Sequence, residues 1–109
     1  MEVTINNNYC IITPLSPKMD EHETERLVHE IALHNDKNIG IDLSWVEDCT
    51  IDFLDKLYRI YDIGLFNISS NILVLLFSMG IDKNLNLYVS LPDFLDNKRR
   101  LLNRKFHTV

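Results

Sequence analysis

Hydrophobic and polar positions follow one another with short periods and predict a chain of alternating strands and helices. Residues 2–5 and 9–13 are β-rich runs that flank three asparagines, a residue that tolerates positive φ, so this segment predicts a hairpin. Asp20, with Glu23 three residues later, resembles a capping box and predicts a helix over residues 21–34. The side chains expected on its buried face are Leu27, Val28, Ile31 and Ala32.

The central stretch, residues 38–61, predicts a buried strand, an acidic loop and the start of a second helix. Residues 38–43 place an apolar side chain at every second position, as in a strand with a buried face. Residues 45–50 show neither the two-residue period of a strand nor the spacing of a helix. Helical spacing of apolar residues begins after Asp52. Thr50 or Asp52 can cap this helix, and the carboxylates of Asp52 and Asp55 suit the positive end of its dipole. Open α/β sheets usually place their sites at such a strand end.

The remaining chain predicts a strand over residues 65–68, a helix over 70–79, a strand over 85–89 and a final helix over 92–105. Gly80 is expected to close the third helix, and Pro92 to open the last one. The six successive apolar residues 72–77 also fit a buried central strand, which is the rival interpretation of the third helix. The basic residues of the last segment are expected to form a solvated helix face. They are Lys98, Arg99, Arg100, Arg104 and Lys105.

The order of these elements predicts an α/β fold with a sheet of mixed direction and right-handed crossovers. A chain of 109 residues with 46% hydrophobic content can bury one core, so we expect a single domain over residues 1–109. A net charge of −5 lacks the basic face that a nucleic-acid binder needs.

No membrane insertion is expected, because the longest apolar run is far shorter than the roughly 20 residues of a spanning helix. The first residues carry no basic signal-peptide segment, so a cytoplasmic location is expected. Cys10 and Cys49 have no metal-ligand spacing, and we expect both to be reduced thiols.

Four stretches carry a resemblance to a known family. Residues 39–46 read Ile-Gly-Ile-Asp-Leu-Ser-Trp-Val, 67–73 read Asn-Ile-Ser-Ser-Asn-Ile-Leu, 79–83 read Met-Gly-Ile-Asp-Lys and 87–95 read Leu-Tyr-Val-Ser-Leu-Pro-Asp-Phe-Leu. With these, nearly the whole chain resembles a STAS domain, the fold of bacterial anti-sigma-factor antagonists and of the cytoplasmic tails of sulfate transporters. The resemblance implies a mixed sheet of about five strands with about four helices mainly on one face, and it favours a helix over residues 70–79.

The chain departs from this family at the start of the second helix. Family antagonists carry Asp-Ser-Ser-Gly-Leu there, and a partner kinase phosphorylates the second serine. The corresponding residues here are Thr50-Ile51-Asp52-Phe53-Leu54, so Asp52 occupies the acceptor position and Thr50 replaces the aspartate. We expect no phosphorylation at Asp52, which would cap or charge the helix start, and Thr50 is the candidate phosphorylation site. The link to the next strand is also about two helical turns shorter than in the family.

No motif points to an enzyme, and no catalytic residue, metal or cofactor is predicted. His29 and Glu30 begin a zinc-like motif, but His34 comes five residues after His29 rather than four, which turns it off the shared face. The chain has only three glycines and no glycine-rich phosphate loop. The carboxylates between Glu47 and Asp55 can bind a hard cation, although such clusters are more often solvated loop charge.

Two surfaces are candidates for binding a protein partner. The first is the acidic loop with the second helix, where the candidates are Trp45, Glu47, Asp48, Thr50, Asp52 and Asp55. Trp45 either caps the core or stands exposed as an anchor. The second surface is the third helix, whose apolar residues cover its whole circumference, so that Leu73, Val74 and Phe77 are expected to point partly outward. Either a homodimer or partner contact covers them, or Tyr58, Tyr61 and Ile63 fold over them.

Two functions fit these expectations. One is a non-catalytic signalling module of the antagonist kind, which binds a kinase-like ATPase with anti-sigma activity or another regulator. The alternative is a cytoplasmic accessory subunit of a lipid or anion transporter, as STAS-like proteins of lipid-export systems are.

Overall fold

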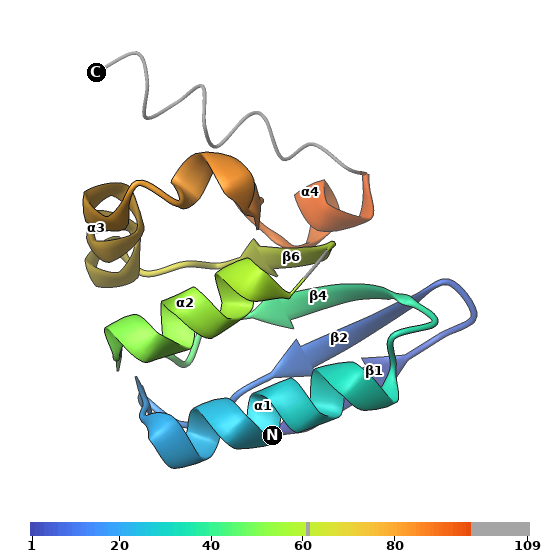
Figure 1. Ribbon diagram of the computed structural model, residues 1–109. Helices are drawn as coiled ribbons and strands as arrows, with labels where there is room; N and C mark the ends of the chain where they lie inside the picture. Colours follow the sequence, from blue (N-terminus) through green and yellow to red (C-terminus); the bar gives the residue numbers. More distant parts are fainter. Residues whose placement is uncertain (61, 97–109) are drawn as a thin grey trace.

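The computed structural model describes residues 1–60 and 62–96, which form a five-stranded mixed sheet and its covering helices (Figure 1). In sheet order, the strands are β1 (Glu2–Ile5), β2 (Tyr9–Thr13), β4 (Asn38–Asp42), β6 (Ile63–Phe66) and β7 (Asn86–Leu87). β1 is antiparallel to β2, and every other neighbouring pair is parallel. The helices are α1 (Glu21–Leu33), α2 (Ile51–Arg59), α3 (Ser70–Met79) and α4 (Leu91–Leu95), with a 3₁₀ turn η1 (Asp82–Asn84).

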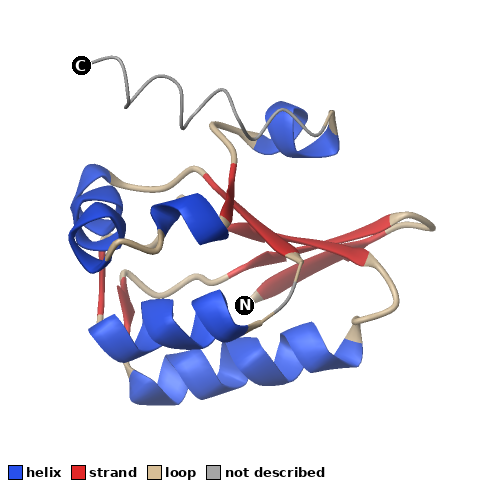
Figure 2. Ribbon diagram, turned by 45° about the horizontal axis from the view of Figure 1, so that its top comes forward, coloured by secondary structure: helices blue, strands red, loops and turns tan. Residues whose placement is uncertain are grey.

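The two faces of the sheet carry different helices. α1, α2 and α3 share one hydrophobic core with the sheet, whereas Phe94 of α4 packs with Ile11, Phe66 and Tyr88 in a second cluster. In β2, Cys10 and Ile12 belong to the first core and Ile11 to the second, as the pleat of a strand requires. Figure 2 shows α4 across the sheet from α1 and α2. The predicted α/β fold with helices mainly on one face is therefore confirmed.

Several predicted elements are confirmed because their signals are local. The hairpin has the predicted bounds, and Asn6 closes it by accepting hydrogen bonds from the N–H groups of Asn8 and Tyr9, both at 2.8 Å. Asp20 caps α1 by accepting from the N–H of Glu23 at 2.9 Å. Residues 70–79 form a helix closed by Gly80 at φ 72°, so the rival strand interpretation is wrong.

Other elements differ from the prediction. β6 lies two residues earlier than predicted, and β7 is shorter. In α1, the residue buried beside Leu27 and Ile31 is Thr24, while Val28 is only half-buried and Ala32 is exposed. The hydroxyl of Thr24 donates to the carbonyl of Asp20, which satisfies this buried polar group. The predicted final helix over 92–105 falls mostly on residues 97–109, outside the described residues.

A small second sheet was not predicted. It pairs β3 (Lys18–Met19) in parallel with β5 (Asp48–Cys49), within the loop for which no period was found. The N–H groups of Glu47 and Asp48 donate to the carbonyl of Pro17, and that of Thr50 donates to the carbonyl of Met19. These bonds join the segment before α1 to the segment before α2, and they place the two helix starts side by side.

Candidate functional site

The segment between β4 and α2 is held by buried side chains at regular intervals. Leu43, Val46, Cys49 and Phe53 are all buried in the first core. The residues between them are forced outward, and the exposed ones are Ser44, Trp45, Glu47, Asp48, Ile51 and Asp52. The predicted acidic loop is therefore an ordered surface fixed by its own core residues.

Two large apolar side chains stand exposed in this segment. Trp45 is 59% exposed and Ile51 is 63% exposed, so Trp45 does not cap the core. Sequence reasoning missed Ile51. The helical stripe of α2 offered a signal, because Ile51 lies outside the set formed by Phe53, Leu54 and Leu57, all of which are buried. Binding hot spots are enriched in tryptophan, so Trp45 is a candidate anchor for a partner, with Ile51 six residues further along the same segment.

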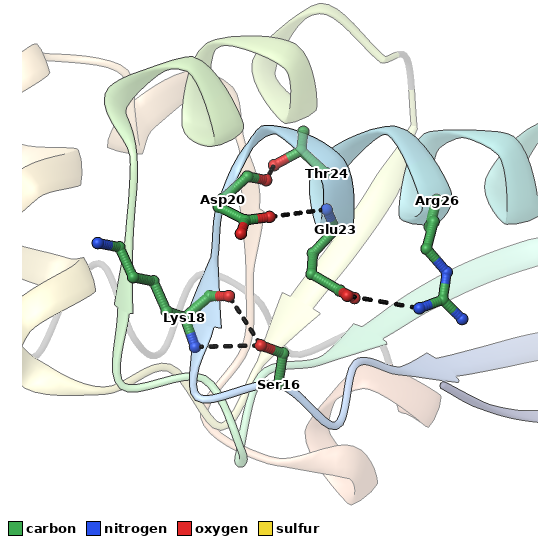
Figure 3. Close-up of polar contacts among 6 residues, drawn as sticks. All are labelled: Ser16, Lys18, Asp20, Glu23, Thr24 and Arg26. Carbon is green, nitrogen blue, oxygen red and sulfur yellow. Dashed lines mark hydrogen bonds and ion pairs between the residues drawn. The ribbon is translucent and has the colours of Figure 1, made fainter.

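The start of α1 adds carboxylates beside this segment, and Figure 3 shows their contacts. The side chain of Asp20 caps the helix, while Glu23 pairs with Arg26 at 3.4 Å (Figure 3). Two residues upstream of β3, the hydroxyl of Ser16 donates to the carbonyl of Lys18 at 2.8 Å and accepts from its N–H (Figure 3). Because β3 pairs with β5, the acidic surface includes the first turn of α1, which sequence reasoning did not assign to the site.

The first turn of α2 shows which residue caps the helix. Thr50 is the cap, and its Oγ1 accepts from the N–H of Phe53 at 3.1 Å. Asp52 lies in the first turn, exposed, with its carboxylate 3.4 Å from Nζ of Lys56. Asp55 pairs with Arg59 at 3.0 Å. The prediction that Asp52 caps α2 is therefore wrong. Its negative charge does lie at the positive end of the helix dipole, as predicted.

Both cysteines are buried free thiols in the described chain. Burial, and secondarily the charge of Asp48, raises the pKa of the Cys49 thiol from 9.0 to about 11. Burial is also the largest cause of the raised pKa of Cys10. A thiol with a raised pKa is a weak nucleophile at neutral pH, because little thiolate is present.

The polar groups nearest to the carboxyl ends of the central strands are Asp42 and Asn67. Oδ1 of Asp42 accepts from Nδ2 of Asn67 at 3.1 Å and from the N–H of Ser44 at 3.0 Å. Asn67 has φ 56°, a conformation that asparagine tolerates. This bond joins the end of β4 to the end of β6. Over the residues described, no three His, Cys, Asp or Glu side chains are grouped as metal ligands would be.

The predicted surface on α3 is smaller than expected. Leu73 is only 9% exposed, so the expectation that it points outward is wrong. Phe77 is half-buried and packs against the first core, while Val74 is 61% exposed. Of the residues proposed to cover this face, Ile63 is buried and Tyr58 is 39% exposed, and Tyr61 lies outside the described residues.

No family model matches the chain, and no curated protein matches it. The resemblance to STAS domains therefore stays a prediction based on the four stretches quoted above. Within residues 1–60 and 62–96, none of the helices has both the length and the apolar character needed to cross a bilayer.

Proposed function

We propose that this protein is a non-catalytic protein-interaction module, similar to anti-sigma-factor antagonists but without their phosphorylatable serine. Its binding surface is the segment 45–52 together with the first turn of α2. The observation that carries the proposal is the exposure of Trp45 and Ile51 in a segment held by buried residues. Since the segment is already ordered, binding loses little conformational entropy there.

The chemistry of this surface describes the partner it fits. An exposed tryptophan offers a large contact area that fits an apolar pocket on the surface of the partner, as is common for binding hot spots. The surrounding carboxylates of Glu47, Asp48 and Asp52 are exposed and favour a partner with a cationic rim. The resemblance to antagonists suggests a kinase-like ATPase or another regulator as that partner.

Affinity capture from the native host, followed by calorimetry with the purified partner, tests this proposal. Trp45→Ala is expected to weaken binding by roughly 30-fold, which corresponds to a hot spot of about 2 kcal/mol. Leu33→Ala is the matched control, because Leu33 is also 59% exposed but ends α1, outside the segment 45–52. Equal affinities of the two variants would overturn the proposed surface. Capture of permease and nucleotide-binding subunits would replace the signalling role by the transporter-accessory role.

A further inference from the structure

The two edges of the main sheet differ in how well they are protected. β7 has two residues, whereas β1 has four, all exposed, and no described strand pairs with its outer edge (Figure 1). Natural edge strands are protected by short length, charged side chains, proline or a bulge. β1 has no proline, lysine or bulge over its four paired positions, and its one charged side chain is that of Glu2 at its first residue.

The hairpin shows which backbone groups of β1 face outward. The N–H of Asn6 donates to the carbonyl of Tyr9 at 3.0 Å, so these residues form a hydrogen-bonded pair. Hydrogen-bonded and non-hydrogen-bonded pairs alternate along an antiparallel ladder. Thr4 and Glu2 therefore direct their backbone groups to β2, and Val3 and Ile5 direct theirs to the open edge.

The side chains of the same two residues continue the core face of the sheet. Val3 lies opposite Ile12 and Ile5 lies opposite Cys10, and both of these β2 residues belong to the first core. Residues directly opposite in a ladder point to the same face. Val3 and Ile5 thus extend this apolar face to the edge of the sheet, where they are 36% and 49% exposed.

We propose that β1 pairs with β1 of a second copy of this chain, antiparallel and about a two-fold axis at Thr4. Val3 of one copy then lies opposite Ile5 of the other, and their outward N–H and C=O groups exchange four hydrogen bonds. The four apolar side chains meet on the face that carries α1. Thr4 lies opposite Thr4 of the second copy, and Glu2 lies opposite Asn6, so no like charges are paired.

Self-complementarity is the reason for choosing a second copy over an unrelated peptide. A cavity of about 150 Å³ between Met1 and α1 is lined by Arg26, His29 and Glu30, which places these α1 side chains beside the start of β1. The two-fold axis makes the two copies of α1 antiparallel on one face of the sheet. In this register every outward N–H and C=O group of Val3 and Ile5 has a partner in the other copy, and apolar side chains face apolar side chains at both ends of the contact.

Disulfide trapping tests the register. Residues opposite each other in a non-hydrogen-bonded pair have Cα atoms about 4.5 Å apart, within the range that a disulfide spans. Under mild oxidation Thr4→Cys is expected to form a covalent dimer, whereas Glu2→Cys, which faces Asn6 of the second copy, stays monomeric. The native thiols of Cys10 and Cys49 are buried and do not compete. Equal cross-linking of the two variants would overturn the proposed register.

Sedimentation equilibrium tests the association itself. The unaltered chain is expected to form a concentration-dependent dimer, and a monomer at every concentration would overturn the proposal. Val3→Pro removes an outward N–H without removing a bond to β2, so it is expected to weaken the dimer by roughly 30-fold or more while circular dichroism stays unchanged. Val3→Thr keeps that N–H and is the matched control. Equal dissociation constants for the proline and threonine variants would contradict backbone pairing at this edge.

Discussion

Thr50 holds the first turn of α2 through one hydrogen bond, in which its Oγ1 accepts from the N–H of Phe53 at 3.1 Å. Two oxygen-bearing residues stand at this helix start, and the sequence could not choose between Thr50 and Asp52, because both side chains favour that position. The choice follows from long-range pairing. β5 keeps Cys49 extended beside Met19, so the first residue free to begin the helix turn is Thr50.

At the residue scale, the expected result is a contrast between two alanine substitutions. Thr50→Ala should lower the free energy of unfolding by about 1 kcal/mol, because the N–H of Phe53 loses its acceptor. Thr50→Ser should restore most of this loss. Asp52→Ala should change stability by no more than about 0.5 kcal/mol, since its ion pair with Lys56 is exposed. Urea denaturation measures all three, and a larger cost for Asp52→Ala would contradict the assignment of the cap.

At the element scale, the position of α4 depends on two glycines that lie side by side. Gly40 and Gly64 are paired in β4 and β6, beneath the ring of Phe94. A β-carbon on Gly40 would lie 2.8 Å from this ring. The ring of Phe94 stacks on Phe66 with centroids 5.7 Å apart and meets Tyr88 edge-on at 5.3 Å. The missing side chains therefore make room for the only helix on that face of the described chain.

The same glycine explains why β6 was predicted two residues too late. In a local pattern glycine usually marks a turn, so Gly64 favours a strand that begins one residue later, at Leu65. Glycine is required at position 64 because a β-carbon there would clash with the ring of Phe94. Phe94 is thirty residues further along the chain, so no local sequence pattern reveals this contact. β3 and β5 were missed because two residues are too few to show alternation. α3 was predicted with the right bounds because Ser69 and Gly80 mark both of its ends locally.

Enlarging Gly64 should displace α4. In Gly64→Ala the new β-carbon would lie 2.7 Å from ring atoms of Phe94 and Tyr88, so we expect a destabilisation of roughly 1–3 kcal/mol from overpacking. In a Phe94→Leu background the contact with the Phe94 ring is removed and that with Tyr88 remains, so the same substitution should cost less. A double-mutant cycle in urea measures this coupling. Additive effects of the two substitutions would show that Phe94 does not limit the size of the side chain at residue 64.

At the scale of the whole molecule, charge is distributed very unevenly along the chain. Residues 1–96 hold all sixteen acidic side chains and only six of the eleven Lys and Arg residues, which gives this part a formal net charge of −10. The other five cations lie in residues 97–109. Such an excess of one sign repels itself in the compact state, while it attracts a cationic partner.

Salt is therefore expected to stabilise the folded chain. The ion pairs that carboxylates form with Lys or Arg among the described residues are at least partly exposed. Each contributes only about 0.3–0.5 kcal/mol, so screening these pairs costs little. Screening of the net repulsion acts in the opposite direction, and raising sodium chloride from about 20 to about 200 mM should increase the free energy of unfolding in urea by roughly 0.5–1 kcal/mol. Glu25→Gln combined with Glu47→Gln removes two exposed charges and should be more stable at low salt, with a smaller response to added salt. A decrease in stability with salt would show that the ion pairs outweigh the repulsion.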